Sequence, residues 1–325
     1  MMRLWRRWVS LFVHAESGEA LALFRIACGL CVLHSVVTLI LSDLHVVLWA
    51  DVQHGGYRTS VRLHWLMQAL GGPTDGVVWA LVITVLTAGA CITTGLGGRL
   101  PPLVAGQCLI ALLRSNPLAG GAYDTLLHNL LWLLVLSRST ATLSLDCRLR
   151  HGVWMRSVQV PTWPRYLVVF QMVVVYASTG IQKVSSHWSP VGGFSALYYT
   201  LQQPSWQRFD MSWLAFVYPL TQVGTAVTWF WEVSSPLLLV ALYFRARPEG
   251  GGWLRAGFKR IDVRALFVTV GLAMHILAWL LMDLGQFTWA SLAMYPCLWR
   301  PDELSCGARM CLHRLRLVRP QGAAP

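Results

Sequence analysis

The feature that most restricts this chain is a series of apolar runs about as long as a lipid bilayer is thick. The stretch YLVVFQMVVVYAST, residues 166 to 179, contains no charged residue, and similar runs recur along the sequence. A helix rises about 1.5 Å per residue, so about 20 apolar residues cross the hydrocarbon core. Charged residues make up 12% of the 325 residues, against roughly 25% in a soluble domain. The chain is therefore predicted to be a polytopic membrane protein.

We place eight spans where such runs are bounded by charges, glycine or proline. Three of them are short and are predicted to be partly re-entrant or shielded by neighbouring helices, because irregular backbone at membrane depth must be buried in protein. The predicted fold is thus an all-α bundle of about eight transmembrane helices. The spans lie near residues 20 to 42, 77 to 97, 100 to 113, 123 to 137, 164 to 184, 220 to 244, 264 to 283 and 286 to 299.

The chain opens with a basic and aromatic segment, MMRLWRRWVSLF. No small-residue cleavage site follows a continuous apolar stretch, so we expect this segment to be retained. Its pattern is typical of an amphipathic helix lying at the membrane surface, and a solvated basic tail is the alternative. The predicted organisation is an interfacial segment over residues 1–19, a transmembrane domain over 20–302 and a basic cytoplasmic tail over 303–325.

The net charge of +12 comes from basic residues placed between apolar runs. They form no aromatic-interleaved patch of the kind that nucleic-acid modules use, so we expect no nucleic-acid partner. Most of the 26 lysines and arginines fall on one side of the predicted spans, which indicates that this side and both termini are cytoplasmic in a multi-pass cell-membrane protein. Arg25 lies within a span, and the opposite side holds Arg58, Arg62, Arg114, Lys183 and Arg208.

Several common site types have no support in the sequence. The eight cysteines are scattered and form no disulfide framework. Cys306, Cys311 and His313 match no common zinc spacing, and we predict no metal site. The chain also has no phosphate-binding loop, no dinucleotide-binding fingerprint and no HExxH motif, which disfavours nucleotide-driven pumping and zinc-protease chemistry.

Ionisable residues inside spans are the candidate functional residues, because each costs about 2.5 to 3.5 kcal/mol at the bilayer centre on insertion scales. Glu232 in TWFWEVSSP and His275 in GLAMHILAW lie near the middle of their spans. Arg25 lies one turn into the first span and is interpreted either as functional or as reaching the inner headgroups. Asp124 and His128 are four residues apart, which places them on one helix face near the outer end of the fourth span.

Lys183, in GIQKVSSHW, is one of only two lysines and ends the uncharged run. It follows Pro164 by a rise of about 28 Å along a helix, which places it at the outer boundary. One interpretation is a lysine that extends its ammonium to the headgroups. In the other, the glycine-rich and aromatic SSHWSPVGGFSALYY bends across the bundle mouth and Lys183 faces the interior. Desolvation there favours a neutral amine that acts as a base, whereas Glu232 or Asp124 nearby would stabilise the ammonium.

The stretch YASTGIQKVSSHWSPVGGFSALYY resembles a segment of vitamin K-dependent γ-carboxylase and of the wider HTTM group. Both have a tyrosine, a small segment, Gly-x-x-Lys, a tryptophan and then glycines and aromatics. ALALFRIACGL, NPLAGGAYDTLL, WFWEVSSPLLL and HILAWLLMDLGQFTWASLAMY resemble other spans of the family. The resemblance covers residues 18 to 302, and the large lumenal region of the carboxylase has no counterpart in this sequence.

The resemblance implies a carboxylase- or lyase-like enzyme in which Lys183 is the base that deprotonates vitamin K hydroquinone or another quinol. It implies that Asp124, His128 and His187 assist, although the segment that holds a catalytic histidine in the carboxylase has Asp124 here, with His128 one turn later. The residues expected to contact the cofactor are Trp188, Tyr198, Glu232, His275 and Arg25.

Two other functions remain open from the sequence. The chain is alternatively a non-catalytic membrane factor for the maturation or export of a secreted peptide or small protein, with its buried charges joining helices. A transporter is the third hypothesis, because intramembrane charges often line pathways, although no inverted repeat is evident. In every case the lipid bilayer is a partner.

Overall fold

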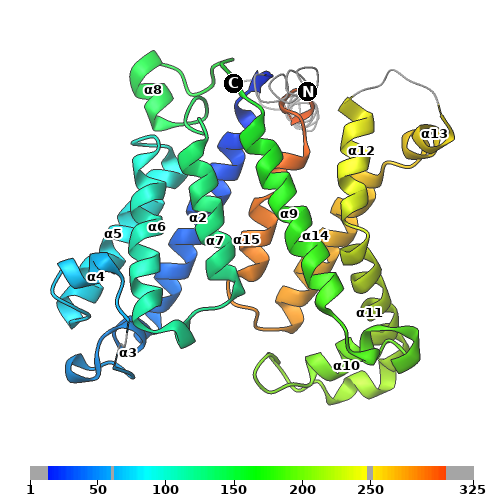
Figure 1. Ribbon diagram of the computed structural model, residues 1–325, viewed down its shortest axis with the longest axis horizontal. Helices are drawn as coiled ribbons and strands as arrows, with labels where there is room; N and C mark the ends of the chain where they lie inside the picture. Colours follow the sequence, from blue (N-terminus) through cyan, green and yellow to red (C-terminus); the bar gives the residue numbers. More distant parts are fainter. Residues whose placement is uncertain (1–13, 60–61, 247–251, 305–325) are drawn as a thin grey trace, which may run out of the picture. The chain divides into compact units, whose positions relative to one another are not determined.

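The structure is a computed structural model that describes residues 14–59, 62–246 and 252–304. Helices make up most of it (Figure 1). The chain divides into two compact units. Unit 1 comprises Met1–Val168 and Ala293–Pro325, and unit 2 comprises Val169–Leu292.

Four apolar helices form the body of unit 1 and pack against one another in chain order, as Figure 1 shows. Each is followed by a tight connection rich in glycine, serine or asparagine, which breaks the helical backbone. The four helices are α2 (Glu19–Leu41), α5 (Asp75–Thr94), α6 (Leu100–Ser115) and α7 (Ala122–Leu136).

Shorter elements complete unit 1. The strands β1 and β2 pair in antiparallel register, with Glu16 opposite Val160. The 3-10 helices are η1 (Val52–His54), η2 (Pro117–Ala119) and η6 (Tyr295–Leu298). The remaining elements are β1 (Ala15–Ser17), α3 (Leu44–Trp49), α4 (Trp65–Ala69), α8 (Leu145–His151), β2 (Gln159–Pro161) and the first turn of α9 (Trp163–Gln182).

Arg25 of α2 is buried in unit 1 and only 2% exposed. Its Nη1 donates to the Ile92 carbonyl at 3.2 Å and its Nη2 to the Leu143 carbonyl at 2.6 Å. Gly95, which ends α5 with φ of +75°, makes room for this side chain, since a Cβ there would overlap the guanidinium. Arg25 therefore ties α2 to the end of α5 through buried protein carbonyls instead of reaching out to headgroups.

A second arginine ties the strand pair to the start of α9. Arg165 Nε and Nη2 donate to the two carboxylate oxygens of Glu16 at 2.5 and 2.8 Å. The Nη1 of the same side chain donates to the Cys297 carbonyl at 3.0 Å. Three segments that are far apart in the sequence thus meet at one bidentate ion pair in unit 1.

Unit 2 is built on the rest of α9 and on three further long helices. The helices α11 and α12 both pack on α14. They form a helix pair bent by 56° where Val233 and Pro236 flank two serines, so the single span expected over residues 220 to 244 is broken at its proline. The long helices are α11 (Tyr218–Val233), α12 (Pro236–Ala246) and α14 (Val263–Leu281).

Unit 2 also contains short elements that connect the long helices. The segment between α9 and α11 contains most of them, and it follows Lys183. They are η3 (Ser186–Trp188), η4 (Pro190–Gly192), α10 (Ala196–Leu201), η5 (Ser212–Val217), α13 (Trp253–Arg260) and α15 (Phe287–Ala293), the last of which ends in unit 1.

Every predicted span coincides with helical structure, which confirms a mostly helical protein with several apolar helices. Among the described residues, four helices are long and apolar enough to cross a membrane, or five if the bent pair is one span, and α6 and α7 are shorter apolar helices. The count of about eight stays a prediction. Of the predicted interfacial helix, residues 1–13 lie outside the described residues and Ala15–Ser17 form β1, while residues 305–325 of the predicted tail also lie outside them.

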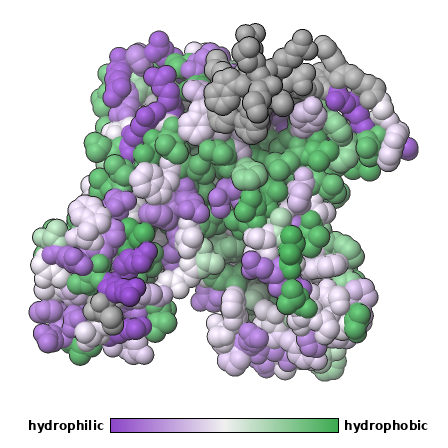
Figure 2. All heavy atoms as spheres, in the orientation of Figure 1, coloured by the Kyte–Doolittle hydropathy of each residue, from purple (hydrophilic) through white to green (hydrophobic). Residues whose placement is uncertain are grey.

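The long helices expose large apolar side chains, as a bilayer requires and water disfavours. Leu30 of α2 is 53% exposed, Ile83 of α5 53%, Phe170 of α9 53% and Leu277 of α14 55%. Figure 2 shows apolar side chains over the middle of the helices of unit 1 and hydrophilic side chains gathered at its α8 end. These surfaces indicate a multi-pass membrane protein.

Candidate functional site

Lys183 directly follows the last residue of α9 and forms an ion pair with Glu232 of α11. The side chains are 20% and 8% exposed, respectively, so the pair is largely withdrawn from water. The ring of Trp188 lies 4.5 Å from Lys183 Nζ, measured to the ring centroid, in a cation–π contact. The ammonium is therefore held between a carboxylate and an aromatic face.

Gly180 explains why this lysine meets this glutamate. A Cβ built at Gly180 would lie 2.9 Å from Glu232 Cβ and 2.9 Å from Val233 N. Such a contact is too short for any larger residue, so only glycine lets α9 approach α11 this closely. One turn later the chain carries Lys183 next to the carboxylate.

The segment after Lys183 folds into two consecutive 3-10 turns, η3 and η4, and η3 contacts α11. Ser185 caps η3, since its hydroxyl accepts from the His187 N–H at 3.4 Å. Trp188, the last residue of η3, is half-buried and covers Lys183. The expected bend of this segment is thus present, with Trp188 over the lysine.

His187 is exposed and has its tautomer set by Ser195. Its Nδ1 lies 2.7 Å from Ser195 Oγ, and that hydroxyl donates its single hydrogen to the Gly192 carbonyl at 2.8 Å. A Ser195 hydroxyl that donates to Gly192 leaves its Oγ to accept from His187 Nδ1–H, and a ring in that tautomer presents its Nε2 lone pair away from this bond.

Tyr198 belongs to a chain of aromatic rings that begins at His187. Tyr199 lies 5.1 Å from His187 and 5.5 Å from Tyr198 between ring centroids, and Tyr198 lies 5.0 Å from Tyr218, all in edge arrangements. Tyr198 also packs against the buried cluster of Leu201 and its neighbours. It supports the segment that carries His187.

His275 lies in the interior of unit 2 and is 2% exposed. Its Nε2 is 2.8 Å from the hydroxyl of Tyr176, which is itself buried and packs edge-on against Trp231 at 4.5 Å. Sequence reasoning missed Tyr176, although it begins the motif YASTGIQK. It lies seven residues, about two helical turns, before Lys183 and so on the same side of α9.

Asp124 and His128 lie in unit 1 and line one cavity of about 420 Å³ together with Arg114. Asp124 Oδ2 accepts the Gly121 N–H at 2.7 Å, which caps the start of α7. His128 Nε2 accepts from Trp132 Nε1 at 3.1 Å. The two residues share one face of α7, as their spacing predicts, and each also has a local structural partner.

The predicted site residues divide between the two units. The structure joins Lys183 directly to Glu232 and Trp188, and it places His187 in the same turn as Trp188. Unit 1 holds Arg25, Asp124 and His128, and unit 2 holds Lys183, His187, Trp188, Tyr198, Glu232 and His275.

The Lys183 and Glu232 pair has two forms of equal net charge. In one, an ammonium donates to a carboxylate. In the other, the proton has moved along the hydrogen bond and leaves a neutral amine beside a carboxylic acid. A medium of low dielectric constant narrows the free-energy gap between the forms, because it penalises separated charges. The two forms differ in which residue holds the proton and not in the net charge of the pair.

A family model of the HTTM domain matches residues 14–245. Comparisons with curated proteins and with solved structures found no match. The matched range contains Lys183, Glu232, Trp188, Asp124 and His128, whereas His275 lies beyond it. Because the match covers well over half of the chain and the described residues include several apolar helices of membrane-spanning length, this protein is an integral membrane protein that belongs to the HTTM family.

Proposed function

We propose that this protein is a membrane enzyme of the vitamin K-dependent γ-carboxylase-like class, in which Lys183 acts as a base toward a lipid-soluble quinol. The observation that supports the proposal is the partly buried pair of Lys183 with Glu232 beneath the Trp188 ring. A lysine in such a setting changes its protonation more readily than an arginine does, which suits it to proton transfer.

An aromatic ring beside Lys183 supports the proposal of an aromatic cofactor. Trp188 lies directly over the amine. Tyr199, whose ring lies 5.1 Å from that of His187, is 54% exposed. Such rings pack against a flat aromatic ligand. A bound quinol would supply an acidic O–H group.

In this proposal each residue has one task. In the amine and carboxylic-acid form of the pair, Lys183 Nζ would take the proton of an O–H group of the ligand. The pair then gains one positive charge, which balances the negative charge left on the ligand oxygen, and Glu232 holds the ammonium in place. His187, through its Nε2 lone pair, then accepts a proton from the Lys183 ammonium, which restores the amine. Tyr198 and His275 orient the elements of unit 2 around Lys183. The assisting role of Asp124 and His128 and the cofactor contact of Arg25, all in unit 1, rest on the family resemblance alone.

The test compares Lys183→Ala and Lys183→Arg with Gln182→Ala, a control at the exposed neighbouring position. The purified full chain is assayed for quinol-dependent modification of peptides, and co-purifying lipids and peptides are identified by mass spectrometry. We expect both lysine variants to lose about 10² to 10⁴-fold in rate, the usual contribution of a general base, while the control keeps its rate. Unchanged turnover in Lys183→Ala would contradict the proposal.

A second function is favoured by the fact that the ion pair bridges two helices, α9 and α11. In a non-catalytic factor for the maturation or export of a secreted peptide or small protein, the pair would serve only to join these helices. Lys183→Arg would then retain function, and the exchange of the two residues, Lys183→Glu with Glu232→Lys, would restore it. A peptide that co-purifies equally with wild type and Lys183→Arg would favour this function.

We also propose that the eight helical segments all cross or enter the bilayer, with both termini in the cytoplasm of a cell-membrane protein. The asymmetry of arginine and lysine supports this orientation. Reporter fusions at each connection and at both ends test it, because a reporter active only outside the cell should respond after residues 58 to 62 and after Lys183. Activity of that reporter at either terminus would overturn the orientation.

A further inference from the structure

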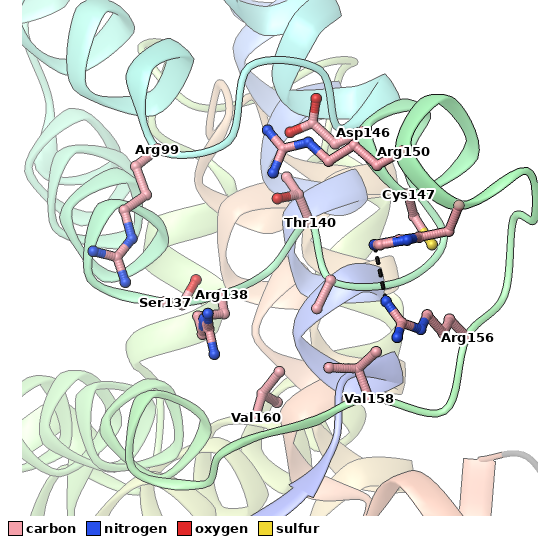
Figure 3. Close-up of a pocket in the computed structure, with 12 residues that line it drawn as sticks. Arg99, Ser137, Arg138, Thr140, Asp146, Cys147, Arg150, Arg156, Val158 and Val160 are labelled. Atoms are coloured by element: carbon pink, nitrogen blue, oxygen red, sulfur yellow. Dashed lines mark hydrogen bonds between the residues drawn. The ribbon is translucent and has the colours of Figure 1, made fainter.

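A cavity of about 490 Å³ lies in unit 1, at the ends of α6, α7 and α8 (Figure 3). Four arginines from four positions in the chain line it. Arg99 precedes α6, Arg138 follows α7, Arg150 lies on α8, and Arg156 lies in the connection to β2. Figure 3 shows these side chains arranged around one hollow.

The positive charge of this cavity is not neutralised by its protein surroundings. Within the part of the chain that the structure describes, Arg99, Arg138 and Arg150 form no ion pair with a carboxylate. Arg156 Nη1 donates to His151 Nε2 at 2.9 Å, which is a neutral partner. The lining contains one carboxylate, Asp146.

Asp146 offsets only part of that charge. It is buried, and its Oδ1 accepts the Gly97 N–H at 3.1 Å. With His151 neutral, the four arginines and Asp146 leave the lining with a net charge of about +3, since an arginine is always protonated and a carboxylate is ionised at neutral pH. The cavity is therefore suited to a ligand with negative charge.

The walls of the cavity are held in place by hydrogen bonds. Leu143 N donates to the Trp154 carbonyl at 2.7 Å, and Arg156 N donates to Thr142 Oγ1 at 3.1 Å. The Leu143 carbonyl also accepts from buried Arg25. These bonds fix the loop that carries Arg138 and the loop that carries Arg156, so little ordering is needed when a ligand binds.

The position of the cavity and its exposed apolar neighbours indicate the source of the ligand. It lies at the start of α6 and just after the end of α7, and helices that span a bilayer begin and end among the lipid headgroups. Leu149, Trp154 and Met155 are 73%, 52% and 61% exposed. Exposed apolar residues and a tryptophan beside arginines are typical of a surface in contact with headgroups and acyl chains.

We propose that this cavity binds the phosphate of an anionic phospholipid, whose acyl chains contact the exposed apolar side chains of residues 149, 154 and 155. The lipid belongs to the leaflet that the charge asymmetry assigns to the cytoplasm, because all four arginines lie in inner segments. The site is separate from Lys183 and does not depend on the proposed enzymatic function.

The test measures thermal unfolding of the purified full chain in a neutral detergent. The probes are a short-chain phosphatidylglycerol, a phosphatidylcholine with the same acyl chains, and inorganic phosphate. We expect phosphatidylglycerol to raise the Tm in a concentration-dependent way. Phosphatidylcholine and phosphate at equal concentration should have little effect.

Variants locate the effect in the cavity. Each of Arg99→Gln, Arg138→Gln and Arg150→Gln should weaken apparent affinity for phosphatidylglycerol about fivefold, and the triple variant on the order of 100-fold. Arg148→Gln is the matched control, because Arg148 is exposed on α8 but does not line the cavity. The single variants keep the test decisive if the triple variant fails to fold.

Three outcomes would overturn the proposal. Equal stabilisation by phosphatidylcholine would remove the role of anionic charge. A full Tm shift from inorganic phosphate would show that the ligand is a free anion and not a lipid. Wild-type affinity in the three single variants, or an equal loss in Arg148→Gln, would show that the cavity arginines are not the site.

Discussion

Two ion pairs, one in each unit, differ in their geometry, in their exposure to water and in the type of cation. Arg165 and Glu16 in unit 1 form a bidentate pair with side chains 4% and 14% exposed, and Arg165 also bonds a backbone carbonyl. Lys183 and Glu232 in unit 2 form a single contact, with the lysine 20% exposed beneath Trp188. An arginine stays protonated at any physiological pH, whereas a lysine can release its proton. The first pair is suited to holding segments together, and the second is the one in which we propose that a proton moves.

The largest expected effect follows from removing the arginine of the first pair. Arg165→Leu leaves the Glu16 carboxylate withdrawn from water without its cation, and we expect it to lower the free energy of unfolding by about 3 to 5 kcal/mol. Titration with a denaturing detergent, followed by circular dichroism, measures this change. The double variant Arg165→Leu with Glu16→Leu should recover much of the loss, and a double variant as unstable as the single one would contradict the assignment.

Removing the lysine of the second pair should lower the free energy of unfolding by less than removing Arg165 does. Lys183→Met leaves Glu232 unpaired, but the carboxylate can regain water through the partly exposed lysine position, so we expect a loss of about 1 to 3 kcal/mol. The same detergent titration applies. Glu232→Gln in the Lys183→Met background should restore stability, and if it does not, the loss arises from packing and not from charge.

Conservative exchanges sharpen the comparison. Arg165→Lys keeps the charge but cannot contact both oxygens of Glu16 and the Cys297 carbonyl with the same geometry, so we expect a loss of about 1 to 2 kcal/mol. Lys183→Arg keeps a cation beside Glu232 and beneath Trp188. We expect it to lower the free energy of unfolding by less than about 1 kcal/mol. An equal loss in the free energy of unfolding for the two exchanges would show that the two pairs depend on bidentate geometry to the same extent.

The smallest effect concerns His187. Ser195→Ala removes the acceptor of His187 Nδ1–H, which lies on an exposed ring, and we expect a loss of about 0.5 to 1.5 kcal/mol. The tautomer should also become mixed. Nitrogen chemical shifts of labelled histidine report this directly, and an unchanged spectrum would mean that Ser195 does not set the tautomer. Ser189→Ala, at an exposed hydroxyl that bonds the Ser186 carbonyl, is the matched control.

The helical segments could be predicted closely from the sequence, because an apolar run inside a bilayer must satisfy its backbone hydrogen bonds internally. Each predicted span lies within a few residues of a helix. The break between α11 and α12 was missed, although Pro236 after two serines is a signal for it. The number of membrane crossings was harder to predict. Short apolar helices such as α6 and α7 fall below the length that by itself identifies a span.

The candidate site was only partly predictable. Lys183, Trp188 and Glu232 were identified from their unusual positions and from the family pattern, and they do meet in unit 2. Tyr176 was missed because a tyrosine in an apolar helix carries no distinctive spacing until its partner, His275, is known. In the sequence, the four arginines of the cavity served only to assign the cytoplasmic side of the membrane. Their convergence on one cavity depends on how four separate segments fold.

The sequence by itself determined the membrane class, the helical segments, the family and the location of a lysine at the end of an uncharged run. These follow from local composition and periodicity, which each segment carries on its own. Tertiary structure alone decided which acid meets that lysine, because Gly180 controls how closely α9 approaches α11. It also decided that Arg25 bonds buried carbonyls and that the cavity arginines have no acidic partner among the described residues. Long-range partners depend on the distances between segments, and those distances are set by packing.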